Sequence, residues 1–218
     1  MRSRLSLLAA VCGAALLLVP HVTARLAAQQ DGWLPLFDGQ SLDGWKVGDN
    51  ASTFSVQDGA IVVFGPRAHL YYMGPIQEHV FTNFEWKADV MTMPGANSGM
   101  YFHTEYQETG WPQKGYEVQV NNSHTDPIRT GSLYNIVNVM NTAPAKDHEW
   151  FTQHIIVIGK QVTIKVNGKT TAEYTEPDNV SRPAGMAGRL IAKGTFALQG
   201  HDPKSRVHFK NLLVKPLP

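Results

Sequence analysis

The sequence predicts an all-β protein, folded as a sandwich or a barrel, on three observations. Turn residues recur every few positions beyond the first 30 residues, as at Asp38-Gly39, Asp58-Gly59 and Pro94-Gly95. Between the turns lie short runs rich in Val, Ile, Thr, Phe, Tyr and Trp, which are the residues that favour strands. No window of twelve residues after the first 28 keeps a helical apolar period. Ten or more short strands at this spacing are typical of a sandwich or barrel.

Several individual strands can be placed by their patterns. From Phe84 to Val90 apolar residues alternate with charged ones, which predicts a half-buried strand. The alternation returns from Val162 to Val166, and Asn167-Gly168 then makes a two-residue hairpin turn into Lys169–Thr175. Three further strands are expected at Phe151–Ile158, Thr195–Gln199 and Val207–Val214.

The first 28 residues are typical of a secretory signal peptide, and residues 29–218 are expected to form one β-sandwich domain. Arg2 and Arg4 precede an uncharged apolar run from Leu5 to Pro20, and small residues follow it. That run is too short to favour a membrane span, although a retained N-terminal anchor is the alternative. The single cysteine, Cys12, lies inside the run. We expect a periplasmic or secreted protein with no membrane span after signal removal.

The charge of the chain argues against two classes of partner. Three of its 19 basic residues lie in the first 28 positions, so 16 basic residues remain against 18 acidic ones. No basic run survives in that remainder, and a slightly acidic protein does not attract a phosphate backbone or an anionic membrane. We therefore expect no nucleic-acid partner, and the oligomeric state stays open.

The most informative segment for function runs from Tyr116 to Asn122. On a strand, Glu117, Gln119 and Asn121 share one face and the residues between them face the core. A carboxylate beside two amides suits sugar hydroxyls, because each amide both donates and accepts hydrogen bonds. An ordinary solvated outer face is the alternative.

A second set of candidate residues lies upstream, after Pro94-Gly95. Asn97 precedes a strand on which Tyr101 and His103 would share a face, and either could join Glu117 if the two strands are neighbours. His103 alone is more often a structural or surface histidine.

The remaining candidates lie in loops, where sites on β scaffolds tend to be built. His124 could transfer protons near neutral pH and Asp126 could orient it, although the two could equally form a polar turn. Trp111 could stack on a sugar ring or cover the end of the core. His201 lies where a strand passes into a loop, and it could belong to the site or simply to a turn. No spacing of His and Asp matches a known ligand set, so neither a metal nor another cofactor is predicted.

Four blocks of the sequence, in order, resemble the 3-keto-disaccharide hydrolase domain family. They are Leu36–Trp45, Gly95–Phe102, Tyr116–Val120 and Gly194–Leu217. The resemblance covers the chain from about Trp33 to its C-terminus. It implies a concanavalin A-like jelly-roll sandwich of two antiparallel sheets, related in shape to laminarinase-type glucanases.

Two departures matter for the chemistry that the resemblance implies. Glucanases of that shape carry two or more carboxylates where this chain has only Glu117, and ordinary glycoside hydrolysis needs a pair. The closing block reads Gly200-His201-Asp202 where the family often has aspartate-histidine-glycine. The missing second carboxylate argues for a different route, in which an exported enzyme cleaves 3-keto-glycosides by elimination and hydration, and the family name fits this route.

In that scheme one general base removes the proton beside the ketone. Glu117 or His124 would serve as base or acid, and Asn97, Gln119 or Tyr101 as polar donors. The alternatives are a non-catalytic carbohydrate-binding module and a structural or interaction domain of the cell envelope, because fold alone does not determine function.

Overall fold

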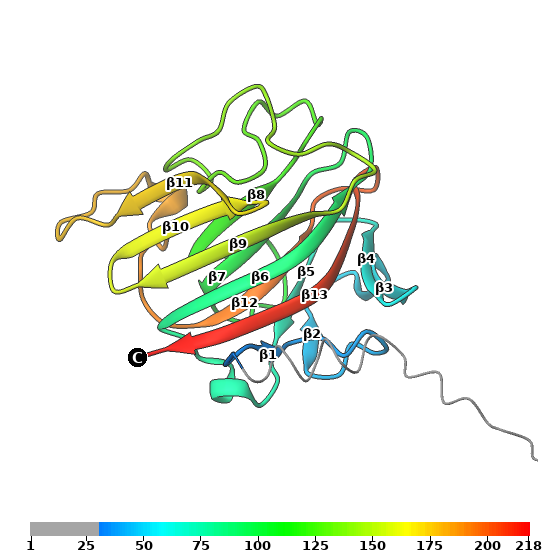
Figure 1. Cartoon of the computed structure of the whole chain (residues 1–218), viewed down its shortest axis with the longest axis horizontal. Coiled ribbons are helices and arrows are strands. Elements are labelled where there is room, and N and C mark those ends of the chain that lie inside the picture. The colour runs from blue at the N-terminus through cyan, green and yellow to red at the C-terminus, as the bar shows by residue number, and fades with distance from the viewer. Residues whose placement is uncertain (1–30) are drawn as a thin grey trace, which may run out of the picture.

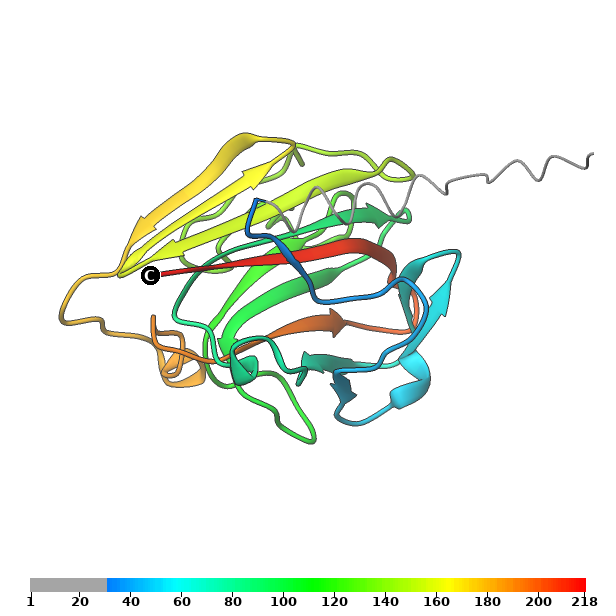
Figure 2. The ribbon, with the colours of Figure 1, turned by 60° about the horizontal axis from the view of Figure 1, so that its bottom comes forward.

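The computed structural model describes residues 31–218, so the expected signal peptide at residues 1–28 lies outside the described residues. Two antiparallel sheets pack face to face (Figure 1, Figure 2). The strand order is β11-β10-β9-β6-β13-β4-β3 in the large sheet, with β1 also paired to β13, and β2-β5-β12-β7-β8 in the small sheet. The predicted all-β sandwich is therefore confirmed.

The bounds of the elements are as follows. The large sheet contains β1 (Leu34–Pro35), β3 (Phe54–Gln57), β4 (Ala60–Phe64), β6 (Asn83–Thr92), β9 (Phe151–Ile158), β10 (Gln161–Val166), β11 (Lys169–Thr175) and β13 (Arg206–Leu217). The small sheet contains β2 (Trp45–Val47), β5 (Ala68–Tyr72), β7 (Ser98–Thr104), β8 (Tyr116–Val120) and β12 (Thr195–Gly200). The helical elements of residues 31–218 are short 3₁₀ turns at Ala51–Thr53, Ile76–His79 and Ala184–Met186. None of the helices in this part of the chain has the length and hydropathy needed to cross a membrane.

The strands of the large sheet follow the predicted patterns closely. Along β6, buried residues alternate strictly with half-buried ones. The hairpin between β10 and β11 turns at Asn167 and Gly168, whose φ angles of 50° and 77° are both left-handed. Two consecutive left-handed residues give the turn the twist that hairpins prefer, and Asn-Gly adopts them at little cost.

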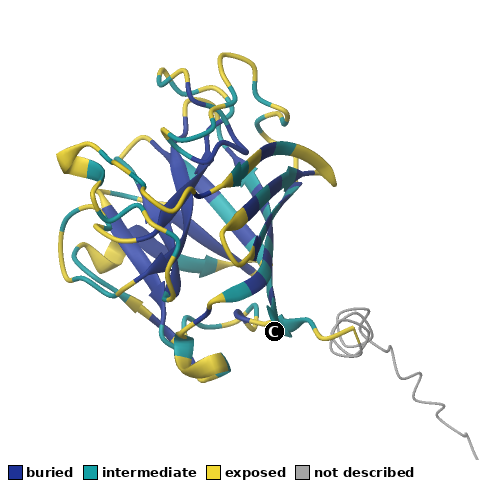
Figure 3. Cartoon of the chain, turned by 90° about the vertical axis from the view of Figure 1, so that its left-hand side faces the viewer, coloured by how far each residue is buried: buried dark blue, intermediate teal, exposed yellow. Residues whose placement is uncertain are grey.

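The hydrophobic core lies between the inner faces of the two sheets, and the exposed residues are mainly in the loops (Figure 3). At its centre the ring of Phe196 from β12 stacks on Trp86 from β6 and on Phe81, with centroid distances of 4.4 Å in both cases. All three side chains are almost fully buried. Such aromatic pairs add about 0.5–1.5 kcal/mol each beyond the area that they bury, so they tie the two sheets together.

The small sheet differs from the large one because both of its faces are buried. Every residue of β5, β7, β8 and β12 is buried, whereas the strands of the large sheet mostly alternate. Loops must therefore cover the outer face of the small sheet.

Candidate active site

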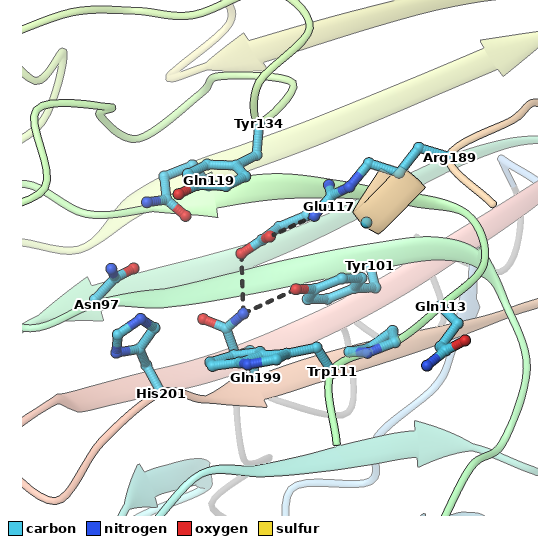
Figure 4. A pocket seen from close by; sticks show the side chains of 12 residues that line it. Asn97, Tyr101, Trp111, Gln113, Glu117, Gln119, Tyr134, Arg189, Gln199 and His201 are labelled. Carbon is cyan, nitrogen blue, oxygen red and sulfur yellow. Dashed lines mark hydrogen bonds and ion pairs between the residues drawn. The ribbon is translucent and has the colours of Figure 1, made fainter. Parts of the chain in front are cut away.

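Polar side chains gather on the outer face of the small sheet. Tyr101 of β7 pairs with Glu117 of β8 across one ladder, and with Ala197 of β12 across the other. Because alternate residues of a strand face opposite ways, Gln119 joins Glu117 and Gln199 lies two positions from Ala197 on the same face. These polar residues surround a cavity of about 270 Å³ (Figure 4). Its lining consists of Asn97, Tyr101, Trp111, Pro112, Gln113, Glu117, Gln119, Tyr134, Gly185, Arg189, Gln199 and His201.

Glu117 is the carboxylate of this cavity, and it is only 5% exposed. Its Oε1 accepts a hydrogen bond from Gln199 Nε2 at 2.9 Å, and Arg189 Nη2 lies 3.5 Å from its Oε2. Burial raises the pKa of Glu117, while the charge of Arg189 and hydrogen bonds from Tyr101 and Gln199 oppose that shift. A carboxylate with a raised pKa is a better proton acceptor at neutral pH than an exposed one.

Tyr101 is held as a neutral hydroxyl beside that carboxylate. Its oxygen accepts a hydrogen bond from Gln199 Nε2 at 2.9 Å. Burial, followed by the charge of Glu117, raises the pKa of Tyr101 well above its usual value. The hydroxyl therefore keeps its proton and can donate it in a hydrogen bond.

Several buried polar atoms around the cavity have no hydrogen-bond partner among residues 31–218. They are the amide oxygens of Asn97, Gln119 and Gln199 and the Nη1 nitrogen of Arg189. Such atoms cost about 1–3 kcal/mol each when they stay unpaired. Three acceptors and one charged donor facing a common space suit a ligand rich in hydroxyl groups.

Aromatic rings border the cavity on the side of β5. Trp111, which is 44% exposed, lies edge-on to His69 at 5.6 Å and is tilted against His201 at 5.5 Å. His69 itself is 2% exposed. Burial, together with the charge of Arg67, lowers the pKa of His69 to about 3. An exposed indole at the rim of a polar cavity is available for stacking on a sugar ring.

The loop after β8 is organised by two of the predicted residues. Asn121 donates hydrogen bonds to the backbone oxygens of Asp126 and Ile128, so its side chain is used inside the loop. Asp126 accepts a hydrogen bond from the Tyr134 hydroxyl at 3.1 Å. Burial and the charge of Asp126 raise the pKa of Tyr134 to about 12. The structure thus places Asn121 and Asp126 behind the cavity, where they hold Tyr134 in its wall.

His124 and His201 come together although 77 positions separate them in the sequence. Their rings lie 5.5 Å apart, and His201 Nδ1 is 2.8 Å from Asp202 Oδ2. Burial and the neighbouring His201 lower the pKa of His124. Within the described chain, His124, His201 and Asp202 form the group whose donor atoms are close enough to hold a metal ion.

His103 lies away from the cavity, and the expectation that it shares a face with Tyr101 is wrong. The pairing of β7 with β12 shifts register between Tyr101 and Thr104, and His103 has a left-handed φ of 55°. A bulge of this kind re-aims a side chain. His103 instead hydrogen-bonds the Thr82 oxygen and the Ala192 nitrogen, so it has a structural position.

The alternative of a solvated outer face is also wrong for β8, because Glu117, Gln119 and Asn121 are almost fully buried. Six residues predicted from the sequence line the cavity, namely Asn97, Tyr101, Trp111, Glu117, Gln119 and His201. Four other cavity residues were not predicted, namely Gln113, Tyr134, Arg189 and Gln199. The alternation of β12 could have revealed Gln199, whereas no pattern marks Arg189.

Residues 32–215 match the model of a family described as the 3-keto-alpha-glucoside-1,2-lyase-like domain. A protein named 3-keto-disaccharide hydrolase, from Bacteroides thetaiotaomicron, is 24% identical over 177 residues. The alignment covers 69% of this chain and 61% of that relative, so the chain spans less than two thirds of the relative's length.

Solved structures match the fold of the whole described chain. A candidate glycosyl hydrolase from Parabacteroides distasonis superimposes with a TM-score of 0.74 and 22% identity, covering 88% of this chain and 97% of the other. A Bacillus subtilis protein with a galectin-like fold gives a TM-score of 0.57 and 11% identity, over 84% and 94% of the two chains. The concanavalin A-like jelly roll that the sequence resemblance implies is therefore confirmed.

Proposed function

Because this chain belongs to the 3-keto-alpha-glucoside-1,2-lyase-like family, we propose that it is an exported enzyme that cleaves the glycosidic bond of 3-keto-glycosides. The carbohydrate substrate agrees with the name of its Bacteroides relative. The leader expected at residues 1–28 supports export, and a reporter fused to those residues that stays in the cytoplasm would contradict it.

One observation carries the proposal: Glu117 is the one carboxylate among the twelve described residues that line the cavity. Retaining and inverting glycosidases need two carboxyl groups that flank the scissile bond. A 3-keto-sugar avoids that need, because the ketone acidifies the hydrogen on C2 and a single base can then begin the cleavage.

The reaction proceeds in two stages. Glu117 takes the proton from C2, and the electrons of that C–H bond pass into an enolate at the C3 oxygen. Collapse of the enolate forms a C1–C2 double bond and breaks the bond from C1 to the glycosidic oxygen, which receives the proton from the Glu117 carboxyl. Water then adds to C1 and a proton returns to C2, so the net change is hydrolysis and Glu117 is regenerated.

The surroundings of Glu117 support this role. Arg189 and the neutral hydroxyl of Tyr101 are fixed positive and dipolar groups close to the place where negative charge develops, and preorganised donors of this kind stabilise enolates. The unpartnered amide oxygens of Gln119 and Gln199 can accept hydrogen bonds from sugar hydroxyls and so fix the ring.

The proposal is tested with Glu117→Gln, a 3-keto-glucoside and its unoxidised parent sugar. We expect cleavage of the keto-sugar only, with the variant slower by about 10²–10⁴-fold, which is the usual contribution of a general base. Glu173→Gln, which removes an exposed carboxylate on β11, is the control and should keep full activity. Because burial raises the pKa of Glu117, kcat/KM should rise with pH through that pKa as the carboxylate loses its proton.

Deuterium at C2 of the substrate distinguishes elimination from direct displacement at C1. Elimination requires slower cleavage of the deuterated sugar, whereas displacement is insensitive to it. Cleavage of the parent glycoside at the same rate as the keto-sugar would refute the proposal. A folded protein that binds the glycan and cleaves neither sugar would favour the binding module, for which the exposed Trp111 is the supporting feature.

A further inference from the structure

We propose that His124, His201 and Asp202 bind a divalent transition-metal ion at the edge of the cavity. The three residues come from two separate loops, one after β8 and one after β12. Each offers a nitrogen or oxygen ligand atom, and these atoms lie within 4.8 Å of one another. Two histidines and one carboxylate on one side of an ion, with the other positions open, are a ligand set typical of divalent iron and related metals.

The spacing of His201 and Asp202 fits adjacent ligands of one ion. His201 Nδ1 and Asp202 Oδ2 are 2.8 Å apart. Bonds of about 2.1 Å from a common metal place neighbouring ligand atoms roughly 3 Å apart. A metal ion can therefore take the place of the proton between these two atoms with little movement of either side chain.

Hydrogen bonds already hold the Asp202 side chain and the backbone of His124 in place. Asp202 accepts hydrogen bonds from Lys204 N at 2.8 Å and from Ser205 Oγ at 2.7 Å. On the other loop, the carbonyl oxygen of His124 accepts a hydrogen bond from Arg129 Nη1 at 2.6 Å. Outer hydrogen bonds of this kind orient metal ligands and reduce the cost of ordering them.

A buried amide lies beside one of the three ligands. Asn97 is 3% exposed, its Oδ1 has no partner in the described chain, and its Nδ2 lies 3.5 Å from His124 Nδ1. Figure 4 shows the Asn97 side chain beside the imidazole of His201. The donor end of the amide, rather than its unpartnered oxygen, therefore faces His124 and holds that side of the loop in place.

The position of the site suggests what the ion does, and this step rests on the proposed function. His201 lines the same cavity as Glu117, so the open positions of the metal face the substrate. Coordination of the C3 carbonyl oxygen would draw electrons from the carbonyl and make the C2 hydrogen more acidic. The ion would then stabilise the enolate that forms when Glu117 takes the proton.

The test measures metal binding without any substrate. The purified protein is stripped with EDTA, incubated with Mn²⁺, Co²⁺ or Zn²⁺, desalted, and analysed for bound metal. We expect about one equivalent per chain for at least one of these ions, with affinity at least tenfold weaker in His124→Gln and in Asp202→Asn. His148→Gln, which removes an exposed histidine, is the control and should bind as the wild type does. Melting curves of the metal-free variants verify that they are folded.

Failure of this proposal can be told apart from failure of the proposed function. Full cleavage of the keto-sugar by stripped protein that takes up no metal would overturn the metal site and leave the function standing. The site would likewise be overturned if His124→Gln and Asp202→Asn bound the metal as tightly as the wild type and the His148→Gln control. If Asp202→Asn lowers activity while the wild-type protein binds no metal, His201 and Asp202 act as a proton-transfer pair instead, and the metal site is wrong. Specific metal binding without cleavage of any keto-sugar would support the site and refute the function.

Discussion

The two faces of the small sheet are equally buried, but they are built from opposite kinds of residue. Val118 and Leu198 face the other sheet and belong to one continuous apolar core. Their strand neighbours Glu117, Gln119 and Gln199 face the other way and are at most 5% exposed. The same two strands, β8 and β12, therefore carry an apolar face and a polar face, separated by the thickness of a single sheet.

The difference lies in how many buried polar groups each face gathers in one place. On the inner face each side chain gains from removal of its apolar surface from water, about 25 cal/mol for each Å². On the outer face the amide oxygens of Gln119 and Gln199 have no partner in the described chain, which costs stability. Burial alone thus does not show what a residue is for. The core holds single unpartnered atoms, such as Trp86 Nε1 and Gln153 Oε1, whereas several such atoms line one cavity on the outer face, and that grouping marks a face prepared for a ligand.

The largest effect on stability is expected for Phe196→Ala on the inner face. Phe196 stacks on Trp86 and Phe81 at the centre of the core. We expect a loss of about 3–5 kcal/mol in the free energy of unfolding, because a large cavity forms where the sheets meet. Urea denaturation measures the loss. Activity per folded molecule should stay within a few-fold of the wild type, since Phe196 does not line the cavity.

The matched control for that prediction is Phe64→Ala. Phe64 is 49% exposed at the end of β4, so its removal should change stability by about 0.5 kcal/mol or less. Equal effects at the two positions would mean that the inner face does not dominate stability.

A smaller effect is expected from the titration of His69 on the outer face. Burial and the charge of Arg67 lower its pKa to about 3, whereas in the unfolded chain it is about 6.5. Between these values the unfolded state binds a proton that the folded state does not, so the histidine favours folding fully above pH 6.5 and progressively less as the pH falls. The loss reaches on the order of 3 kcal/mol at pH 4.

His69→Gln removes this titration, and it should flatten the fall in stability between pH 7 and pH 4 relative to the wild type. Thermal melting across that range checks the slope. His148→Gln is the control, because it removes an exposed histidine and should follow the wild-type curve. A variant of His69 with the wild-type slope would show that acid sensitivity arises elsewhere than on the outer face.

The strands and side-chain positions that follow local patterns could be predicted from the sequence, whereas those set by distant contacts could not. The alternation of β6, the Asn167-Gly168 turn and the polar positions of β8 are local patterns with a period of two, so they were predicted correctly. His103 was misplaced, because a bulge reverses the face of a strand and nothing in the sequence marks it. Arg189 reaches Glu117 from a loop 72 positions away, and such a meeting depends on tertiary folding.

The burial of the outer face was also invisible from the sequence. Polar residues in alternation with apolar ones normally face water, and Glu117 and Gln119 fit that pattern. What hides them is a set of loops that contribute Trp111, Tyr134 and Arg189 to the cavity. Loop conformation depends on these distant contacts rather than on local propensity, so the sequence predicted which polar residues of β8 share a face without predicting what covers them.

The smallest effect, and the one that tests the comparison most directly, is expected for Gln119→Met. Methionine keeps an unbranched side chain of similar length and removes the unpartnered Oε1, while the one hydrogen bond that is lost, from Nε2 to the Ile128 oxygen, is long at 3.4 Å. The free energy of unfolding should therefore change by less than about 1 kcal/mol, whereas the substrate should bind about tenfold more weakly because one hydroxyl loses its acceptor. Steady-state kinetics would show a higher KM with kcat less affected, and Gln161→Met at the exposed start of β10 should alter neither property. A loss of several kcal/mol in stability with unchanged KM would mean that Gln119 is part of the structural core after all, and that both faces of the small sheet serve the fold.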